Sequence, residues 1–141
     1  MRITSKIGLA AAVLGSVAFA AQPASAVSAL VGVNLAKSGP YSAPATCNGA
    51  VGAATSLNSI TYVIKATATA VATNGAAGVG TSVHCVIRDT RSGAVYGGAD
   101  GGLPGPMAVA VGTATVPLSA TVVAQVCSGA AFSNGGSFSS C

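Results

Sequence analysis

The sequence predicts an all-β protein, an antiparallel immunoglobulin-like sandwich of about seven strands held by two disulfides. Apolar residues recur at every second position through most of the chain, and the three- and four-residue spacing of an amphipathic helix is absent. Glycine, proline and asparagine separate the alternating runs, as they separate the strands of a sandwich. The four cysteines form an even set, which in an exported chain indicates two disulfides. A closed barrel is the alternative architecture.

We expect residues 1–26 to be a signal peptide. Arg2 and Lys6 give a positive start, and an apolar run follows. Ala24-Ser25-Ala26 fits the small-x-small rule for cleavage after Ala26, and Ala21 is the alternative site. The apolar run is shorter than the roughly 20 residues that cross a bilayer, although an uncleaved anchor is the alternative. Cleavage leaves residues 27–141 as one secreted β-sandwich domain, and we expect no membrane span after it.

Residues 27–141 carry little charge, and this charge does not predict a nucleic-acid surface. Four cations accompany two carboxylates: Lys37, Lys65, Arg88 and Arg91 with Asp89 and Asp100. No basic cluster with interleaved aromatic residues is present, so nucleic acid is not an expected partner. The partner is not identified by the sequence, and the classes that remain are a cell-wall polymer and another surface protein.

The first half is predicted as two strands separated by a loop. Residues 27–35 alternate until a Ser-Gly-Pro turn. Residues 40–54 contain two prolines and two glycines, so we expect a loop or an irregular edge, with Cys47 tying it down. Residues 60–73 alternate most clearly and end at Asn74-Gly75, a strong hairpin signal.

Three further strands are predicted at 79–89, 107–116 and 120–132. The first of them has alternating faces. Its inward residues are Val83, Cys85 and Ile87, and its outward residues are Ser82, His84 and Arg88.

Residues 97–106 follow a short strand at 94–97 and form the longest stretch rich in glycine and proline. We expect a surface loop, and such loops carry recognition sites on many β-sandwiches. The candidate binding residues are Gly98, Asp100, Leu103 and Pro104. A plain connection between strands is the alternative. A phosphate cradle is not expected, because it needs a strand-to-helix turn and usually a lysine.

The last hairpin favours one disulfide pairing. Ser133-Asn134-Gly135 suits a three-residue hairpin loop, and folding back there places Cys127 opposite Cys141, within disulfide reach. We therefore favour Cys127–Cys141 and Cys47–Cys85. A bond between Cys85 and Cys127 is the alternative. It needs a bulge or a strand buried on both faces, because the neighbours of the two cysteines place them on different faces.

No set of residues predicts catalysis, a metal or a cofactor. His84 is the only histidine, and Asp89 and Asp100 are the only carboxylate side chains. A catalytic triad also needs an activated serine, and the Gly-x-Ser-x-Gly elbow is absent. Two aspartates without tryptophan do not indicate a glycosidase cleft. Zinc and calcium are not expected without a Cys-x-x-Cys pair or several carboxylates. We therefore expect a protein that is not an enzyme.

The run Arg88-Asp89-Thr90-Arg91 concentrates the charge of the domain in four residues. Arg88 and Arg91 form a candidate charged patch for an anionic partner such as a cell-wall polymer. The alternative is an exposed turn with a local ion pair, which contributes little to stability.

Three features carry a resemblance to known proteins. They are the segment Ala21-Gln22-Pro23-Ala24-Ser25-Ala26, the bias toward Ala, Gly, Thr and Val, and Tyr96-Gly97-Gly98…Gly101-Gly102-Leu103-Pro104-Gly105-Pro106. On these features the chain resembles small secreted β-rich proteins of high-GC Gram-positive bacteria, whose function is uncharacterised. It is also similar in size to the antibiotic chromoprotein apoproteins, which are two-disulfide immunoglobulin-like sandwiches. Their cystines close short local loops, a pattern that only Cys127–Cys141 matches.

These observations predict a secreted, non-catalytic binding or structural module, at the cell envelope or in the extracellular medium. The alternative is a small-ligand carrier like the chromoprotein apoproteins, with an apolar cleft lined by residues such as Tyr62 and Phe132.

Overall fold

A computed structural model describes residues 29–52 and 57–141, and within them every regular element is a strand. The predicted cleavage site after Ala26 lies outside the described residues. The strands are β2 (Leu30–Ser38), β3 (Tyr41–Val51), β4 (Ser59–Thr69), β5 (Val71–Ala72), β6 (Gly78–Asp89), β7 (Val95–Pro104), β8 (Met107–Pro117), β9 (Val122–Phe132) and β10 (Ser137–Ser139).

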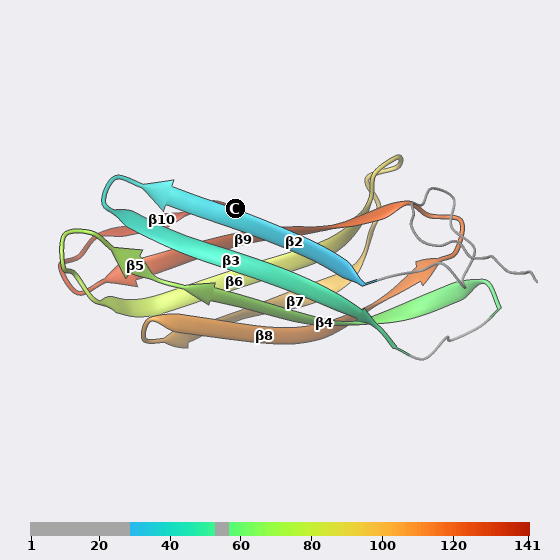
Figure 1. Ribbon diagram of the computed structural model, residues 1–141, viewed down its shortest axis with the longest axis horizontal. Helices are drawn as coiled ribbons and strands as arrows, with labels where there is room; N and C mark the ends of the chain where they lie inside the picture. Colours follow the sequence, from blue (N-terminus) through green and yellow to red (C-terminus); the bar gives the residue numbers. More distant parts are fainter. Residues whose placement is uncertain (1–28, 53–56) are drawn as a thin grey trace, which may run out of the picture.

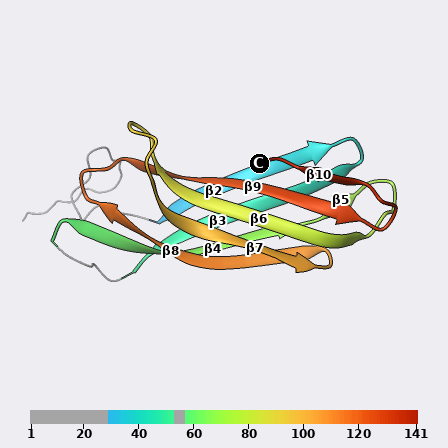
Figure 2. The ribbon, with the colours of Figure 1, turned by 180° about the vertical axis from the view of Figure 1, so that it is seen from behind.

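These strands form one antiparallel sheet in the order β10-β9-β6-β7-β8-β4-β3-β2, with β5 beside β3. The sheet folds into two layers. The strands β2, β3, β4 and β8 form the front layer in Figure 1, whereas β9, β6 and β7 face the viewer in Figure 2. The two ends of the sheet come together again, because β2 packs against β9 and β10. The result is a flattened, nearly closed barrel.

The predicted all-β, antiparallel class with two disulfides is confirmed. The seven-strand immunoglobulin-like arrangement is not confirmed, since the described residues form one continuous sheet of nine strands. An immunoglobulin sandwich has two separate sheets instead.

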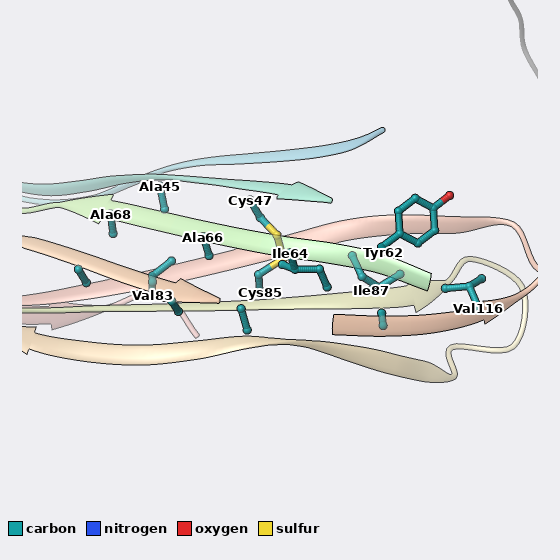
Figure 3. Close-up of a cluster of buried hydrophobic side chains, with 14 of the residues drawn as sticks. Ala45, Cys47, Tyr62, Ile64, Ala66, Ala68, Val83, Cys85, Ile87 and Val116 are labelled. Carbon is teal, nitrogen blue, oxygen red and sulfur yellow. A yellow bond between two sulfur atoms is a disulfide. The ribbon is translucent and has the colours of Figure 1, made fainter. Parts of the chain in front are cut away.

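The core lies between the two layers and is made by the inward residues of alternating strands. Its largest fully buried side chains include Ile64 on β4 with Val83 and Ile87 on β6. Many of the remaining positions are alanine, and these small side chains let the layers approach closely. The Cys47–Cys85 disulfide crosses this interior from β3 to β6, two strands that are not neighbours in the sheet (Figure 3).

The segment 40–54 was expected to be a loop or an irregular edge, and this prediction is wrong, because β3 lies between β2 and β4 in the sheet. Residues 41–51 form β3, which pairs with β2 along its length. Pro44 lies where the second partner of β3 changes from β5 to β4, between the pairs Ser42↔Val71 and Ala45↔Ala68. A missing N–H is tolerated at such an interruption. Cys47 therefore joins two layers rather than tying down a loop.

The segment 97–106 was also predicted to be a surface loop, and most of it is strand β7. This strand lies between β6 and β8 in the sheet. A side chain at Gly98 would overlap the Cys85 carbonyl, and one at Gly112 would overlap the Gly98 carbonyl. The glycines therefore serve close strand approach at the bend where β7 meets β8, and only residues 105–106 form the turn.

Replacing Ile64 tests whether the core lies between the two layers. We expect Ile64→Ala to lower the free energy of unfolding by about 2–5 kcal/mol, because it leaves a cavity in a fully buried site. Val63→Ala is the matched control on the exposed face of the same strand, and it should cost less than about 1 kcal/mol. Denaturant unfolding with both disulfides intact measures the difference. Equal losses in the two variants would contradict the assignment of the faces.

Replacing Gly98 tests whether residues 97–104 are a strand rather than a loop. Gly98→Ala should prevent folding or destabilise the protein by about 3 kcal/mol or more, because its Cβ meets backbone that cannot swing aside. Gly102→Ala is the control on the same strand, where the nearest atom to an added Cβ is 3.5 Å away. Thermal unfolding of both variants measures the difference in stability. A Gly98→Ala variant as stable as the natural chain would indicate that this segment is a loop.

Candidate functional site

The four residues predicted to form a binding loop do not form one. Gly98 is held between strands, and Asp100 points outward from the middle of β7. Leu103 and Pro104 are exposed at the far end of the same strand. The four residues are therefore spread along a paired strand. Among them, only Asp100 has a side chain beside another ionisable side chain.

That group is His84, which lies directly opposite Asp100 on β6. The imidazole Nδ1 and the Asp100 Oδ1 are 3.4 Å apart, and both side chains are substantially exposed. On its other side His84 lies opposite Cys127 of β9. The sequence placed His84 on an outward face but missed this pairing, because Asp100 was assigned to a loop.

The predicted charged patch is divided by the structure. The Arg88 guanidinium donates to the Gln125 side chain at 2.8 Å and to the Gly93 carbonyl at 2.7 Å, so it holds the turn between β6 and β7. Arg91 stands exposed at the tip of this turn. Arg88 thus stabilises the turn, and Arg91 is the exposed cation at its tip.

Asp89 organises the same turn. Its carboxylate accepts hydrogen bonds from the Arg91 backbone N–H and the Ser92 hydroxyl, each at 3.0 Å. The bond from the Arg91 N–H is the main reason that the pKa of Asp89 lies below its ordinary value, with the Ser92 bond and the Arg91 charge adding to it. Asp89 is therefore a turn-forming carboxylate rather than a partner for His84.

The outward side chains of β2, β3, β4 and β8 form a surface that we call the front face. It carries an unusual amount of exposed aliphatic surface, with Leu35 at 75% and Val111 at 73%. Its exposed large apolar residues are Val31, Val33, Leu35, Val63, Met107, Val109 and Val111. Scattered exposed residues of this kind are normal, but a set sharing one face indicates an interaction surface.

Hydroxyl groups lie between these aliphatic residues. The side-chain oxygens of Thr46 and Thr67 are 3.0 Å apart, and those of Thr61 and Thr115 are 3.2 Å apart. The strand register aligns one row across four strands as Val111, Lys65, Asn48 and Val31. The front face is thus a regular array of aliphatic groups, hydroxyls and one central ammonium.

The charges of the domain are unequally distributed between the faces. Lys65 lies at the centre of the front face and Lys37 near its β2 edge. Both aspartates lie elsewhere, Asp89 at the end of β6 and Asp100 on β7. The sequence did not reveal the front face, because the outward valines of β2 and β8 come to share one face with Lys65 only through the register.

The residues suggested for a ligand cleft do not meet. Tyr62 and Phe132 are each only 3% exposed, and they belong to two separate apolar clusters. Burial raises the pKa of the Tyr62 phenol. Phe132 stacks on Tyr41 instead, with ring centroids 4.4 Å apart. Neither ring lines an open cleft, so these residues give no support to the small-ligand carrier.

Within residues 29–52 and 57–141, no three His, Cys, Asp or Glu side chains gather as metal ligands do. The same residues contain no helix long and apolar enough to cross a membrane.

No family model, no curated protein and no solved structure matches the chain. The two disulfides are typical of an oxidising, extracellular environment.

The lowered pKa of Asp89 predicts a pH-dependent contribution to stability. A carboxylate with a lowered folded-state pKa stabilises the fold above its ordinary titration range and loses this effect as the pH falls through the folded pKa. We expect Asp89→Ala to lower the melting temperature slightly at pH 7. The difference in melting temperature between this variant and the natural chain should become smaller in acid. Asp100→Ala is the control, measured by the same thermal scans. A gap unchanged by acid would show that the carboxylate charge is not the cause.

Proposed function

We propose that this chain is a secreted, non-catalytic binding module that attaches to an anionic polymer of the cell envelope through its front face. The observation that carries the proposal is the combination on one face of exposed aliphatic side chains with Lys37 and Lys65, and without any carboxylate. A face of this kind attracts anions and does not repel them at any point. Its exposed apolar groups also gain free energy when a partner covers them.

The chemistry of the face favours an extended polymer over a compact ligand. The array runs across four paired strands rather than around one point. Threonine hydroxyls both donate and accept hydrogen bonds, which suits the sugar and phosphate oxygens of an envelope polymer. Aromatic stacking platforms are absent from the front face, so recognition rests on charge, hydroxyl groups and aliphatic contact.

Reversing one charge on the front face tests the proposal. We expect Lys65→Glu to weaken co-sedimentation with purified cell walls by roughly three- to tenfold, which corresponds to about 0.7–1.4 kcal/mol. Arg91→Glu is the matched control, because it changes the net charge equally but lies at the turn between β6 and β7. Equal losses in the two variants would indicate non-specific attraction to net charge.

A second variant tests the apolar part of the face. Val111→Ala removes exposed aliphatic surface beside Lys65 and adds no hydroxyl. Binding that persists in high salt should decrease in this variant, because screening weakens ionic contacts but not apolar ones. The natural chain failing to sediment with any wall fraction would overturn the proposed function.

A further inference from the structure

The two disulfides differ in their access to solvent. Cys47 and Cys85 are both fully buried, and their bond crosses the core. Cys127 is half-buried and Cys141 is exposed, so their bond lies on the outer surface of the rear layer. A thiol from solution reaches the second bond without unfolding of the protein, whereas the first requires opening of the core.

The outer bond stands in a row of chemically active side chains. The register places Asp100 opposite His84, and His84 opposite Cys127. Directly opposed residues of antiparallel strands have Cβ atoms about 4.5–5.5 Å apart, so the side chains of His84 and Cys127 leave neighbouring positions on the same outer face. Asp100 lies 3.4 Å from Nδ1, and no hydrogen bond occupies Nε2 among the described residues. The row thus joins a carboxylate, an imidazole and an accessible disulfide.

We propose that Cys127–Cys141 is a thiol-exchange site, at which an external thiol opens the bond and becomes attached to Cys141, with His84 protonating the departing Cys127 sulfur. This inference concerns the rear layer and does not depend on the proposed function of the front face. The external thiolate attacks the Cys141 sulfur, a new S–S bond forms, and the Cys127–Cys141 bond breaks. The released electron pair stays on the Cys127 sulfur, which takes the proton of the His84 imidazolium. The exchange is redox-neutral overall.

Each residue of the row has a distinct part in this step. A cationic imidazole lowers the pKa of a neighbouring thiol, and a better leaving thiol departs faster. Asp100 is a positioning residue that holds the ring through Nδ1. The only other charged group on this face of β6 near His84 is Arg88, while β9 offers the uncharged Gln125 beside Cys127. Arg88 lies four residues along the strand from His84, and its guanidinium binds Gln125 and the Gly93 carbonyl.

The attached group would sit where the sheet closes. Ser140, the neighbour of Cys141, donates its backbone N–H to the Ser128 carbonyl at 3.0 Å. Its hydroxyl accepts from the Asn34 side chain of β2 at 3.1 Å. These bonds keep the end of the chain beside β9 and β2 after the disulfide opens. Exchange therefore yields a folded protein carrying its partner at the β2–β9 seam.

The experiment incubates the folded, oxidised protein with reduced glutathione, followed by acid quenching, alkylation and peptide mapping by mass spectrometry. We expect glutathione on Cys141 and an alkylated Cys127, with Cys47–Cys85 intact. The outer bond should open faster by a hundredfold or more, an order-of-magnitude estimate for attack without unfolding. Reduction of both bonds at similar rates, or glutathione attached mainly to Cys127, would overturn the proposal.

The role of His84 has its own readout, the pH profile of the rate constant per glutathione thiolate. In the natural chain this constant should rise as the pH falls through the range in which histidine gains its proton. In His84→Ala it should stay flat and be about tenfold lower at pH 6. Ser82→Ala, on the same face of β6, is the control and should keep the natural profile. An unchanged profile in His84→Ala would remove His84 from the mechanism.

Discussion

The disulfide between Cys47 and Cys85 is the interaction on which the rest of this structure depends. Seven of the fifteen residues in the main core cluster are alanines, which bury little apolar surface each. Closing the 38-residue separation contributes about 4 kcal/mol in the chain-entropy treatment. That equals the burial of about two large aliphatic side chains, at roughly 1.5–3 kcal/mol each. A thin core with few large residues therefore relies on a covalent link between its layers.

The small residues that make the core thin also determine the shape of the sheet. Alanine in the interior lets β4 and β6 lie close together, and Gly98 and Gly112 let β7 and β8 meet at a sharp bend. At the other closure, an added Cβ on Gly32 would come within 2.5 Å of the Ala124 carbonyl oxygen. One sheet can fold back on itself because glycines allow the strands to approach closely at both places. The disulfide in the interior and the glycines where the layers meet together let one sheet form two closely packed layers.

Alternation of residues predicted much of this fold, and local composition misled the rest. The alternation of residues placed Val83, Cys85 and Ile87 on the buried face of β6 correctly. The hairpin predicted at Ser133-Asn134-Gly135 is present and joins β9 to β10. The favoured disulfide pairs are the ones that the structure contains. β3 and β7 were missed because Pro and Gly normally interrupt strands. The proline of β3 is tolerated because its partner strand changes there, and the glycines of β7 are needed because neighbouring strands approach closely. Both reasons depend on tertiary structure, so the local sequence does not reveal them.

The functional surfaces were hidden from the sequence for the same reason. Lys65 gains Val111 of β8 as an aliphatic neighbour, and His84 gains Asp100 and Cys127, only when distant strands take one register. Because the period of a strand is two, a shift of one residue would bury these groups or separate them. The interior disulfide ties β3 to β6 and so resists such a shift in both layers at once. Its stabilising role and the composition of the two outer faces are therefore linked. The buried bond holds the register that places the outer disulfide beside His84 and places Lys65 among valines.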